Sequence, residues 1–379
     1  MSTNAARHLS LRPDILQRLK GAACAADLWP FLQSAVELEH STIPPYLSAL
    51  YSIKKGHNVA AAQIIHSIVV EEMLHMTIAA NVLNAIGGRP VINHPKFIPT
   101  YPGPLPMNVD DGLIVGLAPL SLDLVQNVFM RIELPETPQH FPRLLKAPGE
   151  RGYATIGEFY DAIIARIVAL GQGIFTGDPA RQVVDNAWFP PDQLFPVTDV
   201  ASAVRALEVI KRQGEGTSHN PFDGDGQPAH YYRFEEIVAG HRLVRDPMAP
   251  QGYSFTGAPV PFEPEGVIQF VENSHLSDYA PDTLAYSGVA QANYTYTSLL
   301  NALHTTFNGE PNKLRASLGL MFELRLVVLE KVVNQPADGS APTGDTLYAA
   351  PAFQFAPAGA TADFAAAPIV TAETVAAQS

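Results

Sequence analysis

Residues 59–88, VAAAQIIHSIVVEEMLHMTIAANVLNAIGG, decide the fold of this chain. Apolar side chains recur there at intervals of three and four residues, which is the spacing of one helix face. Two glycines end the pattern, as they commonly end helices. The segment therefore predicts a helix over 59–86. The predicted buried face carries Ile65, Ile68, Glu72, His75, Ala79, Val82 and Ile86.

A second helix is predicted just before it, over residues 26–55. Its face, in steps of four and three, carries Leu28, Leu32, Ala35, Glu39, Thr42, Tyr46, Ala49 and Ile53. The short loop at 56–58 makes the two helices antiparallel neighbours. Pro44 and Pro45 fall inside the first helix and remove two amide donors, which predicts a kink or break, or else a boundary between two collinear helices.

Both faces are apolar except at Glu39, Glu72 and His75. A buried carboxylate is costly unless it is paired or binds a metal, and neither face holds Lys or Arg. A Glu opposite Glu-x-x-His is half of the carboxylate di-iron ligand set of four-helix bundles. These three residues are therefore predicted metal ligands, and Glu71 replaces Glu72 if the register is off by one. The alternative is a polar core held by hydrogen bonds alone.

Two other Glu-x-x-His matches lack this position. Glu37 and His40 lie beside the apolar face of the first helix, which predicts a surface pair or a pair that contacts the ligands. Glu272 and His275 stand in VENSHLSDYAP, a predicted loop. The pattern is specific only where it falls on a buried helix face.

A complete site needs ligands from a second pair of helices. Glu215 stands between glycines in QGEGT, and His230 begins the segment HYYRFEEI, so both are predicted as further metal ligands. The alternatives are a solvated helix-end glutamate and an exposed first-turn histidine. Other residues considered as ligands or neighbours of ligands are Glu208, Glu235 and Glu236, whereas His241 is expected to have an ordinary structural role.

Mixed Glu and His ligands favour iron, as one or two ions, over manganese or zinc. Three tyrosines are expected near the site. They are Tyr46, Tyr51 and Tyr232. Ordinary core packing is their expected role, and lining a substrate pocket is the alternative.

The rest of the chain predicts an all-α fold with extra helices and long loops rich in proline, which makes up 33 of 379 residues. Further helices are expected at 121–133, 155–170, 199–213, 230–244, 285–307 and 311–333. We divide the chain into an N-terminal extension (1–25), a helical domain (26–335) and an Ala/Pro-rich tail (336–379). Short strands are expected only near 98–116 and 253–270.

Composition excludes several functions. The net charge of −13, with no basic cluster, argues against a nucleic-acid partner. No apolar run reaches the ~18 residues of a membrane span. Residues 1–27 lack a secretory signal pattern, and the single cysteine, Cys24, allows no internal disulfide. We therefore expect a cytoplasmic protein that acts on a small molecule, with a homodimer as a possible state.

The segments ELEHSTIPPYLSALYSI (37–53) and IVVEEMLHMTIAANVLNAIGGRP (68–90) resemble the ferritin-like domain of the iminophenyl-pyruvate dimer synthase family. The likeness continues through TIGEFYDAI, RQGEGT, HYYRFEEI and NYTYTSLLNAL and spans roughly residues 25–335. Members of that family act in violacein- and rebeccamycin-type bisindole pathways. The resemblance implies a ferritin-like four-helix bundle and the oxidative coupling of two imines derived from an aromatic amino acid.

Three functions follow as hypotheses. The first is a non-haem iron oxidoreductase that uses dioxygen or peroxide on a small, aromatic or amine-bearing substrate. The second is a non-catalytic protein that binds or handles iron. The third is a structural domain that has lost its metal. Fold alone does not choose among them.

Overall fold

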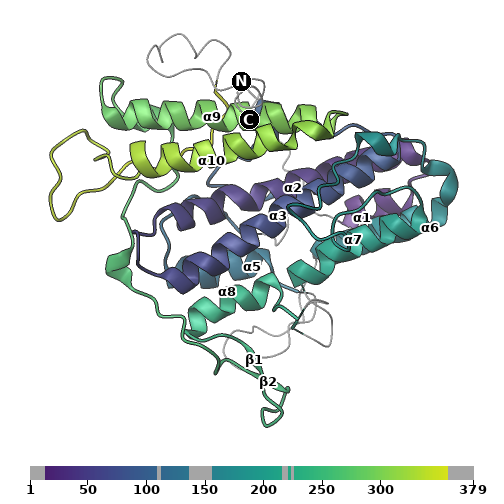
Figure 1. Cartoon of the computed structure of the whole chain (residues 1–379), viewed down its shortest axis with the longest axis horizontal. Coiled ribbons are helices and arrows are strands. Elements are labelled where there is room, and N and C mark those ends of the chain that lie inside the picture. The colour runs from purple at the N-terminus through teal and green to yellow at the C-terminus, as the bar shows by residue number, and fades with distance from the viewer. Residues whose placement is uncertain (1–12, 109–111, 136–155, 216–220, 223–225, 357–379) are drawn as a thin grey trace, which may run out of the picture.

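Two long antiparallel helices, α2 (Ala25–Tyr51) and α3 (Val59–Ala85), form the centre of the protein (Figure 1). The computed structural model describes residues 13–108, 112–135, 156–215, 221–222 and 226–356. Both helices are buried along most of their length, because other helices cover them on several sides. The predicted helix pair is confirmed, but α2 ends before the predicted residue 55, so the connection spans residues 52–58 and includes Asn58 in the left-handed region at φ 46°.

Helix α2 continues through Pro44 and Pro45, so no helix boundary falls there. Pro45 has no N–H to give to the carbonyl of Ser41, four residues earlier. The hydroxyl of Tyr101 donates to that carbonyl instead, at 2.6 Å. A side chain from a distant loop therefore restores the hydrogen bond that the proline removes.

The remaining bundle helices lie against α2 and α3 as two pairs. At one end, α6 (Ile156–Leu170) packs against α7 (Val200–Glu215). At the other end, α8 packs against a short helical segment with three parts. The bounds are α4 (Leu122–Leu124), the π-helical turn η3 (Val125–Phe129), α5 (Met130–Ile132) and α8 (His230–Ala239). Glu133 follows α5 and His230 begins α8, so both stand at helix ends beside the central pair.

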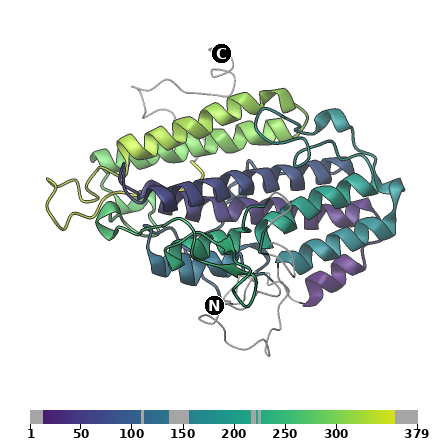
Figure 2. The ribbon, with the colours of Figure 1, turned by 60° about the horizontal axis from the view of Figure 1, so that its bottom comes forward.

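A hairpin of α9 (Leu284–Phe307) and α10 (Leu314–Lys331) covers another face of the central pair. Figure 2 shows this layer on the side of α2 and α3 opposite to α6 and α7. A Cβ at Gly288 would lie 2.0 Å from the carbonyl oxygen of Lys331, so a glycine is required for this close packing.

The smaller elements complete the fold. Helix α1 (Pro13–Lys20) lies inside the segment predicted as an extension, and strands β1 (Val244–Arg245) and β2 (Tyr253–Ser254) pair antiparallel. The 3₁₀ turns are η1 (Pro95–Phe97), η2 (Pro106–Asn108), η4 (Gln172–Ile174), η5 (Pro179–Arg181), η6 (Pro264–Gly266), η7 (Leu276–Asp278) and η8 (Pro311–Lys313). Each predicted helix has a counterpart, which confirms an all-α fold with added helices.

The predicted helix over 230–244 is too long. It ends at Ala239, because Gly240 adopts φ 76° and closes the last turn. No helix within the described part of the chain has the length and apolar character that a bilayer crossing requires.

Candidate metal centre

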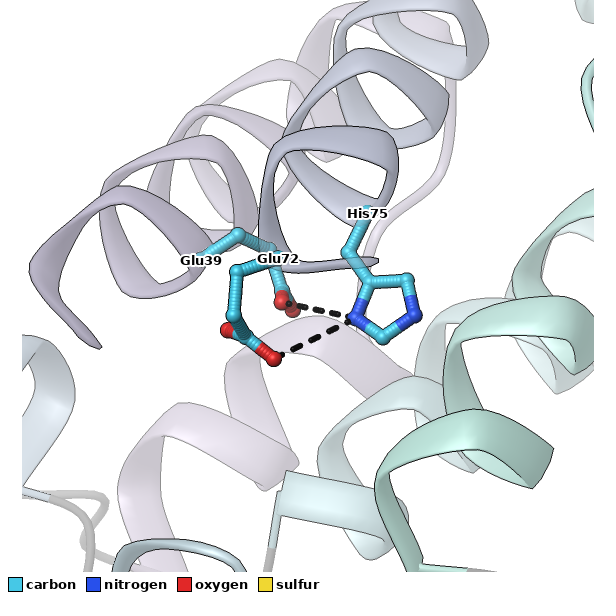
Figure 3. A group of neighbouring side chains, drawn as sticks. All are labelled: Glu39, Glu72 and His75. Carbon is cyan, nitrogen blue, oxygen red and sulfur yellow. Dashed lines mark ion pairs between the residues drawn. The ribbon is translucent and has the colours of Figure 1, made fainter. Parts of the chain in front are cut away.

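Glu39, Glu72 and His75 meet between α2 and α3, where all three are buried (Figure 3). Nδ1 of His75 lies 3.5 Å from Oε2 of Glu39 and 3.6 Å from Oε1 of Glu72. Two ligands bonded to one ion at ~2.1 Å lie ~3.0 Å apart at a right angle and ~3.4 Å apart at the tetrahedral angle. The observed separations are close to those of neighbouring ligands and are too long for direct hydrogen bonds.

A second group shares Glu72 with the first. Nδ1 of His230 lies 3.0 Å from Oε1 of Glu72 and 3.4 Å from Oε2 of Glu133. The rings of His230 and His75 are stacked, with centroids 5.4 Å apart. Because both imidazoles approach the same oxygen of Glu72, the five side chains form two adjoining positions for a cation with one shared carboxylate.

Each of the three carboxylates has one oxygen occupied by a hydroxyl group. The pairs are Tyr160 with Oε1 of Glu39, Thr42 with Oε2 of Glu72 at 2.6 Å, and Tyr46 with Oε1 of Glu133 at 2.5 Å. The other oxygen of each carboxylate is the one that faces a histidine. These hydroxyl donors fix the carboxylates so that their free oxygens converge.

The two imidazoles are fixed in the same manner. Nε2 of His75 lies 2.9 Å from Oε1 of Gln213, and Nε2 of His230 lies 2.8 Å from Oε2 of Glu71. An amide oxygen and a carboxylate only accept, so both Nε2 atoms donate. Each Nδ1 is left facing the carboxylates. Nδ1 of His230 is buried, and none of the described residues is oriented to form a hydrogen bond with it. Such a donor set fits a bound cation.

Charge on these groups follows from their burial and their neighbours. Burial opposes ionisation of Glu72, but contacts with His230 and His75 outweigh it and lower its pKa. For Glu39 burial dominates and raises the pKa. Burial disfavours a charged His75, but Glu39 and Glu72 outweigh it and raise its pKa to about 10. The acidic neighbours of His230 likewise raise its pKa despite burial. Protonated His75 and His230 therefore offset the negative charge of the carboxylates when no cation does.

A small cavity adjoins the cluster. The space open to the centres of water-sized molecules is ≈ 30 Å³, enough for one or two waters or for ions. Its apolar wall consists of Leu38, Ile132, Ile156, Ile210, Gly157 and Gly214. These apolar residues lower the local dielectric constant, which strengthens binding of a cation by carboxylates, and Lys211 also lines the cavity.

Four of the five predicted ligands, Glu39, Glu72, His75 and His230, come together in this cluster. Glu215 ends α7, but its side chain lies outside the described residues. Sequence reasoning missed Glu133. A partial signal was present, because Val125, Phe129 and Glu133 are spaced by four residues, but the segment is short and its middle is a π-helical turn.

The other candidates have separate partners. Glu71 contacts His230 and Arg233 and belongs to neither cation-binding group. Glu208 pairs with Lys211 at 3.8 Å, and Glu236 pairs with Arg242 at 2.7 Å. Glu235 is buried, its Oε2 has no hydrogen-bond partner among the described residues, and burial raises its pKa to about 7. His241 is exposed, and Glu272 and His275 lie in a loop.

His40 corrects one expectation. It is buried rather than on the surface, and its Nε2 lies 2.6 Å from the hydroxyl of Tyr296 on α9. It therefore contacts the covering hairpin and not the cluster. Among the tyrosines, Tyr46 contacts the cluster through Glu133, whereas Tyr51 and Tyr232 are buried in the core.

Helical architecture and the shared carboxylate–histidine cluster together define the class: a four-helix bundle with a candidate di-metal centre in its interior. The family model described as Ferritin-like matches residues 32–239, which is more than half of the chain. The chain belongs to the ferritin-like family.

A solved structure supports the same assignment. The chain is similar to a ferritin-like protein from Caulobacter vibrioides, with 25% sequence identity and a TM-score of 0.57. The similarity covers 83% of this chain and 97% of the other. Among curated proteins, none matches this chain.

Proposed function

We propose that this protein binds two iron ions and oxidises a small organic substrate with dioxygen or peroxide. The observation that carries the proposal is the orientation of the two imidazoles. Both donate through Nε2 and present Nδ1 to the same oxygen of Glu72. Iron suits a site of carboxylates and imidazoles that leaves room for water or oxygen.

The chain's own residues would divide the work. Glu39 and His75 would hold one ion, Glu133 and His230 the other, and Glu72 both. The bound ions would supply electron transfer to dioxygen or peroxide, which accepts the electrons and protons that the substrate loses. Hydroxyl donors keep the carboxylates in place, and the apolar cavity wall lowers the dielectric constant around the site.

The substrate proposal is more specific and rests on the resemblance of the motifs. It is an imine derived from an aromatic amino acid, two molecules of which would be coupled with loss of two electrons and two protons. As the described residues bound it, the cavity beside the cluster has room for dioxygen but not for an aromatic ring. The organic substrate would therefore react from outside this cavity.

The competing function is non-catalytic iron handling, which the ferritin-like fold also supports. The test is anaerobic Fe(II) loading followed by exposure to dioxygen, with and without aromatic amino-acid-derived imines. Oxidation of Fe(II) that requires the imine and yields a coupled product supports the enzyme. Rapid oxidation without substrate supports iron handling. Less than ~0.2 equivalents of metal in protein purified without chelator refutes both.

A further inference from the structure

The two cation positions differ in what stands behind their histidines. Each has one carboxylate of its own and shares Glu72. Behind His75, the acceptor for Nε2–H is the neutral amide of Gln213, at 2.9 Å. Behind His230, it is the carboxylate of Glu71, at 2.8 Å. The two positions therefore differ in the acceptor behind the imidazole, which is a neutral amide for His75 and a carboxylate for His230.

Arg233 keeps this carboxylate charged and in place. Its Nη2 donates to Oε2 of Glu71, and its Nη1 lies 3.1 Å from the hydroxyl of Ser67. The side chain of Arg233 is only 5% exposed, and that of Glu71 is 20% exposed. A buried guanidinium partly offsets the charge of Glu71, but it also holds the acceptor oxygen on the Nε2 side of His230.

We propose that Glu71 makes the position formed by Glu72, Glu133 and His230 the tighter of the two metal positions. An ionised acceptor draws the Nε2 proton more strongly than an amide does and leaves more negative charge on Nδ1, which strengthens its bond to a metal ion. Glu71 is thus a positioning residue that acts through His230. The inference rests on the proposed metal binding and adds the order in which the two positions bind metal ions.

Anaerobic Co(II) titration tests this order, because the visible ligand-field bands of Co(II) report binding without any reaction. The parent protein should bind two ions in two resolved steps. Glu39→Ala leaves the His230 position and should keep the tight step, whereas Glu133→Ala leaves the His75 position and should keep the weak step. If Glu133→Ala retains the tight step, or if the parent binds two ions with equal affinity, the inference is wrong.

Two substitutions, one that removes a negative charge and one that adds a negative charge, distinguish an effect of charge on metal affinity from damage to the fold. Glu71→Gln should weaken the tight step by about 10- to 100-fold, and Gln213→Glu should strengthen the weak step. Damage to the fold would weaken binding in both variants, so that result overturns the inference. Glu330→Gln makes the same charge change at an exposed position on α10 and should alter neither step. No Co(II) binding by the parent would instead refute the proposed metal centre itself.

Discussion

Substituting Glu72 should remove both metal ions, whereas substituting Glu133 should remove one. Glu72 presents the same oxygen to His75 and to His230, and Glu133 faces His230 alone. We therefore expect about two equivalents of metal in the parent, about one in Glu133→Ala, and below ~0.2 in Glu72→Ala. The difference between these variants follows from the sharing of one carboxylate.

Thermal stability gives the size of the effect. At free metal 100-fold above Kd, each ion stabilises the native state by about 2.7 kcal/mol. A chain of 379 residues unfolds with an entropy of about 0.8 kcal/mol per kelvin. Two ions should thus raise Tm by about 7 °C in the parent, by about half of that in Glu133→Ala, and not measurably in Glu72→Ala.

The assay is mass-spectrometric metal analysis together with melting curves in metal and in chelator. Glu37→Ala is the matched control, because Glu37 is on the same helix as Glu39 but contacts Gln33, at 3.1 Å. It should keep both equivalents and the full shift in Tm. If a folded Glu72→Ala protein still binds one equivalent, Glu72 is not shared. If Glu37→Ala loses metal, the helix face is assigned wrongly.

Three further predictions concern single contacts. Tyr101→Phe leaves the carbonyl of Ser41 without its donor and should cost about 1–3 kcal/mol in urea unfolding. In metal-free protein, His230 and Arg233 lower the pKa of Glu71 from 4.5 to about 2 despite its burial. The ionised Glu71 therefore stabilises the native state by about 3 kcal/mol above pH 4.5, and this stabilisation is lost as the pH falls to about 2. Melting curves across this range should show the loss in the parent and less of it in Glu71→Gln. Metal uptake at pH 8 should release about one proton from His75, whose pKa is raised to about 10, and about one from His230, whose pKa is also raised, and a pH-indicator dye should detect both.

The central helix pair was predictable because its pattern is long. Twenty-seven residues in each of α2 and α3 give several turns in which apolar side chains repeat on one face. Glu39, Glu72 and His75 stand out against such a face. Continuity through Pro44 and Pro45 was not predictable, because it depends on Tyr101, which comes from a loop far along the chain.

The second half of the cluster was harder to predict, because its residues stand at helix ends. Glu133 follows a segment whose middle, Val125–Phe129, is a π-helical turn, and a regular helix period does not describe such a segment. His230 was predicted, but the pairing of Glu71 with Arg233 joins α3 to α8. Sequence spacing carries no information about which charged residues meet across two helices.

The order of folding and metal binding follows from the contacts around the cluster. Hydroxyl donors fix one oxygen of each carboxylate, and Gln213 and Glu71 fix the imidazoles, so protein groups alone hold the geometry. Protons on His75 and His230, which their acidic neighbours favour, offset the buried negative charge before a cation binds. We therefore expect this protein to have a folded metal-free state. Metal ions would replace protons in a preformed site and would not be needed to form the bundle.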